Sequence, residues 1–196
     1  LTGYADVSDA YGFMMNMDGH WFYVLTLPTQ RRTFVYDPDE DAWHNRESYQ
    51  LGYWRASCYE QIFGINIVGD SESNKLGQLS RSVYQEYGGH WISRRVSGVF
   101  AAKNKLVSAN RLELTFPSGQ VPQGITHQAR LRWSDNKGLT YGNPMIKEIG
   151  TAGAGNQRLV WWSMGSFRQR VYELSISTAA NRDLIDEDFQ YEVGGL

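Results

Sequence analysis

The sequence predicts an all-β protein, and three observations lead to that prediction. Aromatic residues make up 14% of the 196 residues, and aromatic side chains suit the pleated, half-buried surface of a strand. Apolar and polar residues alternate in many short runs, which places one face of each strand on a core and the other in water. Pairs that favour turns, such as Asp18-Gly19 and Asp37-Pro38, separate these runs. The pattern is typical of strands that tight turns join into a meander.

The pattern of strands and turns in residues 1–100 predicts propeller-like blades. Residues 11–48 divide into four short strands joined by DGH, PTQR and DPDED, and four meandering strands in about 40 residues is the size of one propeller blade. Within them, FVYDPDEDAW at 34–43 resembles kelch-type blades, in which an Asp-Pro turn precedes an inward Trp. A second set of four strands is predicted in 54–100. We expect the tryptophans of this region to lie mainly in blade cores: Trp21, Trp43, Trp54 and Trp91.

Residues 101–196 predict a second β-rich region with longer strands. The segment AAKNKLVSAN at 101–110 is the best candidate for a boundary between the two regions. After it, alternation is clear in 111–116, 130–133 and 172–177. These strands are too long and too unevenly spaced for ordinary blades, so we predict a β-sandwich or a final pair of blades.

Composition limits the partners of this protein. The net charge is -2, with Lys+Arg 19 against Asp+Glu 21, so no global field attracts nucleic acid, and we expect no sequence-specific nucleic-acid binding. No apolar run approaches the ~20 residues of a membrane-spanning helix, so no membrane partner is expected. The single cysteine, Cys58, excludes an intrachain disulfide, and we expect it to be a small buried residue.

The stretch RWSDNKGLTYGNP at 132–144 predicts a hairpin loop that carries many particular side chains. A short polar side chain at 136 can accept hydrogen bonds from N–H groups of the turn, Gly138 permits a positive φ, and the aromatic ring at 141 can pack beneath. The spacing S-x-N-x-G-x-T-Y resembles the Asp-box signature S-x-D-x-G-x-T-W, found on blade hairpins of sialidases and other β proteins. We interpret it as a structural turn and not as a sugar-processing site: Ser134, Asn136, Gly138, Thr140 and Tyr141.

No residue pattern predicts a catalytic, cofactor or metal site. The acidic turn at 37–41 has aspartates at alternate positions, but a calcium-binding EF-hand loop would need Gly and Glu where the chain has Ala42 and Ser48. The four histidines are scattered along the sequence. We therefore expect a non-enzymatic protein without cofactor or metal. The alternative is a carbohydrate-binding or sialidase-like β protein that carries an Asp box.

Three segments of the second half carry a longer resemblance. They run from Ser134 to Gly142, from Arg158 to Gly165 and from Arg168 to Ser177. In this order and spacing they resemble the C-terminal part of the packaged-DNA stabilisation proteins of short-tailed phages, the tail hub or head-completion family. The segment WFYVLTLPTQRRTFVYD, within 11–48, resembles an upstream part of the same proteins. Members of that family are longer than this chain.

The resemblance implies a structural protein of the virion tail. Such a protein sits below the portal ring, closes the head after DNA packaging and docks other tail components. Its expected partners are the portal or adaptor ring and other tail proteins, and the expected assembly is a homo-oligomeric ring. Because arginine and aromatic residues are favoured at interfaces, we expect arginine-bearing loops to be available to neighbours: Arg31, Arg32, Arg168 and Arg170.

Overall fold

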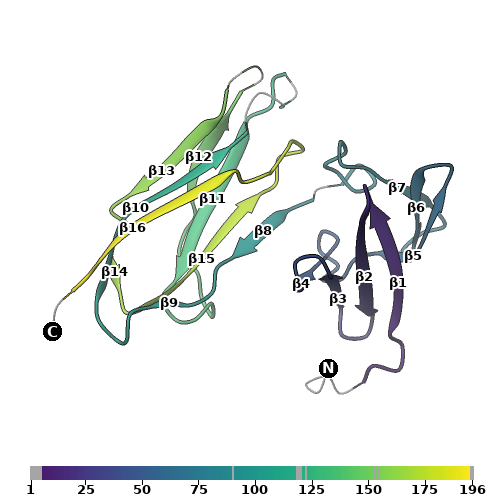
Figure 1. Cartoon of the computed structure of the whole chain (residues 1–196), viewed down its shortest axis with the longest axis horizontal. Coiled ribbons are helices and arrows are strands. Elements are labelled where there is room, and N and C mark those ends of the chain that lie inside the picture. The colour runs from purple at the N-terminus through teal and green to yellow at the C-terminus, as the bar shows by residue number, and fades with distance from the viewer. Residues whose placement is uncertain are drawn as a thin grey trace. The chain divides into compact units, whose positions relative to one another are not determined.

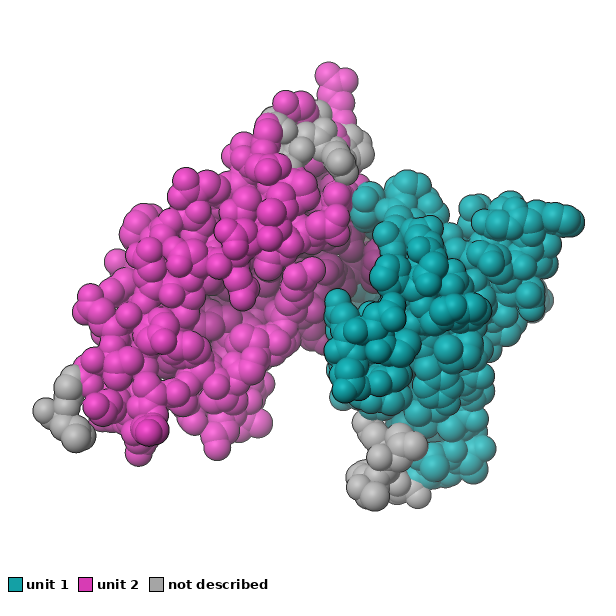
Figure 2. Space-filling model, viewed as in Figure 1, with its two compact units in different colours: residues 1–90 teal, residues 91–196 magenta. Residues whose placement is uncertain are grey.

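A computed structural model covers the chain and describes residues 6–89, 91–117, 121, 123–151, 153 and 155–194. In this part of the chain all regular structure is β-strand, which confirms the predicted all-β class. None of its segments forms a helix long and apolar enough to cross a membrane. The chain divides into two compact units, residues 1–90 and 91–196 (Figure 2).

The first unit contains two antiparallel sheets (Figure 1). One is a four-stranded meander in the order β1-β2-β3-β4, and its strands fall in the four segments predicted within 11–48. The other has three strands in the order β5-β6-β7. The strands are β1 (Tyr11–Met17), β2 (His20–Leu27), β3 (Arg32–Asp37), β4 (Ala42–Asn45), β5 (Ala56–Ile62), β6 (Ile65–Asp70) and β7 (Leu76–Leu79).

Both sheets of the first unit contribute to one small core. Val24 and Val35 are paired across β2 and β3, so they share the face that packs inward. The hydroxyl of Thr33 accepts a hydrogen bond from the backbone N–H of Trp54 at 2.9 Å, which satisfies a polar group in this buried region. The buried members of the core are Met15, Val24, Val35, Trp54, Ala56 and Val68.

The second unit contains two larger antiparallel sheets. In one, the long strand β10 pairs with β13, β14 and β16; the other has the order β12-β11-β15-β8, with β9 also on β15 (Figure 1). The strands are β8 (Ser93–Val96), β9 (Phe100–Ala101), β10 (Val107–Phe116), β11 (His127–Ser134), β12 (Met145–Gly150), β13 (Gln157–Trp162), β14 (Ser166–Phe167), β15 (Gln169–Ile176) and β16 (Asp186–Val193).

The two sheets of the second unit pack face to face around one continuous core. Inward residues come from both sheets, for example Leu114 of β10, Leu131 of β11 and Trp161 of β13. Trp161 is fully buried, so a large aromatic side chain fills the space between the sheets. The architecture is a β-sandwich, which is one of the two predictions for this half of the chain.

The boundary between the units differs from the predicted one. β8 was expected to be the last strand of a second blade, but it pairs with β15, from Ile176↔Ser93 to Glu173↔Val96. This pairing extends the sandwich sheet, so the units divide between residues 90 and 91 and not at residue 100. The second sheet of the first unit therefore has three strands. In the part of the chain described, no sheet closes into a ring.

Two of the four tryptophans expected in blade cores lie on the surface. Trp21 is 52% exposed and Trp43 is 56% exposed, because alternation puts them on the face opposite Val24 and Val35. The kelch-like expectation of an inward Trp43 is therefore wrong. Trp54 is buried as expected. Trp91 belongs to the second unit.

Candidate functional site

The hairpin between β11 and β12 brings its predicted polar residues together. The Ser134 hydroxyl accepts a hydrogen bond from the N–H of Gly138 at 2.9 Å and donates to Oδ1 of Asn136 at 2.7 Å. The same Oδ1 accepts from the N–H of Thr140 at 2.9 Å, and Nδ2 of Asn136 donates to the Thr140 hydroxyl at 2.7 Å. These side chains satisfy backbone and hydroxyl groups of the turn itself.

Gly138 and Tyr141 complete this turn. Gly138 has a φ of 87°, a left-handed conformation that glycine adopts without steric cost. A Cβ atom at Gly138 would lie 3.3 Å from the Tyr141 hydroxyl. The Tyr141 ring also lies beneath the guanidinium of Arg132, 4.7 Å from its centroid. The aromatic residue therefore packs under the loop and joins it to β11.

The prediction that Arg170 is available to neighbours is wrong, because Arg170 is only 3% exposed. Its Nε and Nη2 atoms donate hydrogen bonds to the two carboxylate oxygens of Asp135, at 2.6 and 2.9 Å. Its Nη1 atom donates to the backbone oxygen of Met164 at 2.6 Å. Burial tends to lower the pKa of Arg170, but the hydrogen bonds to Asp135 help to hold that pKa above its ordinary value. The guanidinium lies over the rings of Trp133, Phe167 and Tyr172.

Asp135 is thus a key residue of the hairpin that the sequence analysis did not single out. It fixes the loop to the buried guanidinium of Arg170, and this pair connects β15 to the end of β11. One signal in the sequence could have revealed that Arg170 is buried. In the alternating run predicted at 172–177, Tyr172 and Leu174 are apolar, and Arg170 lies an even number of positions from both, so it falls on their face of the strand.

The other three arginines of the interface prediction are exposed. Arg31 and Arg32 belong to the first unit. Arg31 lies in the turn before β3, and Arg32 is the first residue of β3. The side chain of Arg31 folds back and donates to the backbone oxygen of Leu51 at 2.8 Å. Arg168 belongs to the second unit and donates to the backbone oxygen of Asn104. It lines a shallow polar depression with Ala101, Asn104, Asp135 and Gln169.

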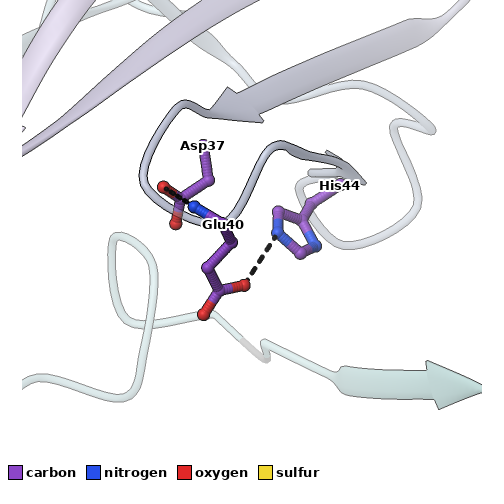
Figure 3. Close-up of side chains that lie close together, drawn as sticks. All are labelled: Asp37, Glu40 and His44. Carbon is purple, nitrogen blue, oxygen red and sulfur yellow. Dashed lines mark hydrogen bonds and ion pairs between the residues drawn. The ribbon is translucent and has the colours of Figure 1, made fainter.

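Three residues that could hold a metal ion come together at the β3–β4 turn, although sequence spacing predicted no metal site. Ligand atoms of Asp37, Glu40 and His44 all lie within 4.8 Å of one another (Figure 3). Oδ1 of Asp37 accepts hydrogen bonds from the N–H groups of Asp39 at 2.9 Å and Glu40 at 3.3 Å. Close by, Nδ1 of His20 lies 3.0 Å from Asp39.

Cys58 is exposed and not buried as expected. It lies in β5, where Gly69 of β6 is its partner across the sheet. A Cβ atom added to Gly69 would lie 2.7 Å from the sulfur. The close approach of the neighbouring strand therefore depends on a glycine.

Comparison with protein families identifies the second unit. The family model described as bacteriophage P22 Gp10, beta-sandwich, matches residues 93–186. The match begins at the first residue of β8 and ends at the first residue of β16. It confirms the resemblance to proteins of the short-tailed phages over this segment, and the expected location in the tail of the virion. A search of curated proteins found no significant match.

Proposed function

We propose that this chain, whose residues 93–186 carry the β-sandwich of the bacteriophage P22 Gp10 family, helps to close the phage head after DNA packaging and docks other tail components. The family match to the second unit is the observation that carries the proposal. It supports a structural protein of the phage tail. The roles at the portal and in docking are our extension of that match.

The rigidity of the sandwich favours a docking role. A continuous core joins its two sheets, and the Asp135–Arg170 pair fixes the hairpin that follows β11. Side chains on such a scaffold keep their positions without a partner, so less conformational entropy is lost when a partner binds. This property suits a protein that receives other components in a fixed geometry.

The sandwich also has an uncovered edge that suits a protein partner. β16 pairs only with β10 among the described residues, and unpaired strand edges tend to find another chain. Tyr191 and Val193 of β16 are 46% and 44% exposed, and Leu106 beside them is 48% exposed. We propose that this edge, with Arg31, Arg32 and Arg168, contacts the portal or adaptor ring, other tail proteins or the next copy in a homo-oligomeric ring.

We further propose that the protein is not an enzyme. The hydroxyls of Ser134 and Thr140 and the amide of Asn136 bind one another and the backbone of the turn, which is the arrangement expected of a structural loop. Incubation with a fluorogenic sialoside should give no turnover. Turnover that disappears on mutation of one arginine or carboxylate would instead support the sialidase-like alternative.

A DNA-retention assay tests the proposed function. Packaged heads that carry the portal but lack this protein are mixed with the purified full-length protein, and released DNA is measured with a fluorescent dye. We expect the protein to reduce the leakage. Tyr191→Ala should reduce this protection, whereas Trp162→Ala, at an exposed aromatic residue of β13, should protect as well as the parent. Unchanged leakage with the parent protein would refute the proposal.

A further inference from the structure

The β3–β4 hairpin places a histidine and two carboxylates on one side of the first unit's four-stranded sheet. Asp37 pairs with Ala42 and Val35 pairs with His44 across this hairpin. Because Asp37 and Val35 are two residues apart, Asp37 and His44 lie on the same face. Glu40, in the turn between the strands, directs its carboxylate toward the imidazole, and its Oε2 lies 3.9 Å from Nε2 of His44 (Figure 3).

One of the three candidate ligands is already held in position. Asp37 is only 9% exposed, and its Oδ1 is fixed by two N–H groups of the turn. The side chains of Glu40 and His44 are 69% and 54% exposed, so they can adjust. Tetrahedral coordination with bonds of about 2.1 Å separates ligand atoms by roughly 3.4 Å, so small rotations of these two side chains suffice.

We propose that Asp37, Glu40 and His44 bind a divalent transition metal ion of the zinc class, with a fourth position left for water or a partner's side chain. An imidazole with two carboxylates is a ligand set that zinc accepts. Calcium prefers six to eight oxygen ligands, and a histidine in the set therefore favours zinc over calcium. Asp39 and Asp41 add negative charge to the same turn.

Metal binding would tie the edge strand β4 to the end of β3. β4 has four residues and pairs only with β3 among the described strands, and a ligand that binds only the folded state stabilises it. The metal would thus stiffen the edge of the first unit. This inference does not depend on the proposed function of the tail protein.

Calorimetric titration of the metal-free chain with ZnCl₂ tests the proposal. We expect one zinc ion per chain. Changes at residues that only support a metal ligand typically weaken binding about 10- to 100-fold, so loss of a ligand in His44→Asn or Glu40→Gln should weaken binding at least about tenfold. His20→Asn is the matched control and should bind like the parent, because His20 contacts Asp39 and not the three ligands.

A second readout separates coordination from a change in folding. Co²⁺ added to the parent should give the strong visible absorption bands typical of a four-coordinate ion, and these bands should be absent in His44→Asn. Circular dichroism should be the same for all variants, because His44 is a surface residue. The proposal is refuted if the parent binds no zinc, or if His44→Asn and His20→Asn bind zinc equally.

Discussion

Each unit of the molecule contains a bidentate Arg–Asp pair. The aspartate is the more buried partner in the first unit, and the arginine is the more buried partner in the second. In the first unit Arg55 binds Asp70 at 2.6 and 2.5 Å, and the carboxylate side chain is fully buried while the guanidinium is 22% exposed. In the second unit the side chain of Arg170 is 3% exposed and that of Asp135 is 50% exposed. The two pairs should therefore respond differently to the loss of a partner and to pH.

The chemistry of the buried member explains that difference. A buried aspartate that loses its arginine can take up a proton and become neutral. A buried arginine that loses its aspartate stays charged, because its guanidinium does not deprotonate in proteins. We therefore expect the pair in the second unit to be the more sensitive of the two.

The largest predicted effect is that of Asp135→Ala. Removing one partner of a buried ion pair typically costs about 3–5 kcal/mol, so we expect a loss of about 3 kcal/mol in the free energy of unfolding of the second unit. Urea unfolding gives this value, and hydrogen exchange in β11 and β15 assigns it to the sandwich. Arg170→Met should cost less stability, because it removes the buried charge itself and leaves Asp135, which is half exposed. Equal stability of Asp135→Ala and the parent would show that the pair does not hold the hairpin.

The next effect is a pH dependence that belongs to the first unit. The hydrogen bonds from Arg55 lower the pKa of Asp70 to about 2, whereas an unfolded aspartate titrates near 3.9. The lowered pKa stabilises the folded state above pH ~4, and this contribution of about 2 kcal/mol is lost as pH falls from about 4 to 2.

Hydrogen exchange in β5 and β6, measured across this pH range, tests the assignment. The parent should lose protection in these strands as the pH falls. In Arg55→Met the loss over the same range should be smaller, because the carboxyl group no longer has its charged partner. If protection in β5 and β6 falls with pH in the same way in both proteins, the Arg55–Asp70 pair is not the cause of the pH dependence.

A smaller effect is expected for Gly138→Val. A β-branched residue resists a φ of 87°, and we expect a loss of about 1 kcal/mol, the lower end of the cost of such backbone strain. Gly98→Val is the matched control, because a Cβ atom there meets nothing within 4 Å and no positive φ is present. If the Gly138 and Gly98 variants melt at the same temperature as the parent, the left-handed glycine is not needed in the turn.

The smallest effect is expected for Asn136→Asp, which restores the residue of the Asp-box signature. The carboxylate can still accept from the Thr140 N–H and the Ser134 hydroxyl, the two bonds now made by Oδ1. We expect a change in stability below about 0.5 kcal/mol, as for most substitutions that keep local contacts. A thermal melt suffices to measure it, and a large loss would mean that the Nδ2 group is essential to the turn.

Alternation and turn residues predicted the all-β class and the four strands of the first sheet, because these signals are local. The partner of β8 could not be predicted in this way, because the local pattern of residues 93–96 is the same whichever strand they pair with. The same limit applies to Trp21 and Trp43, since an aromatic residue fits either face of a small sheet.

The candidate sites show the same division. The polar residues of the hairpin were found from their spacing, because the turn is local and its hydrogen bonds span at most four residues. Asp135 and Arg170 are far apart in sequence and come together only through the pairing of β11 and β15. The candidate metal-binding cluster also depends on strand pairing, because the register of β3 and β4 places His44 beside Asp37.

We propose that this protein docks at the portal end of the phage head, and a sedimentation assay measures this docking. Labelled full-length protein is mixed with packaged, portal-bearing heads that lack it. We predict saturable cosedimentation, weakened by Arg168→Glu and preserved in Arg130→Glu, which makes the same change of charge at another exposed arginine. Equal weakening by both variants would refute the role of Arg168. If the parent protein stays in the supernatant at every concentration, it does not dock at the portal end of the head.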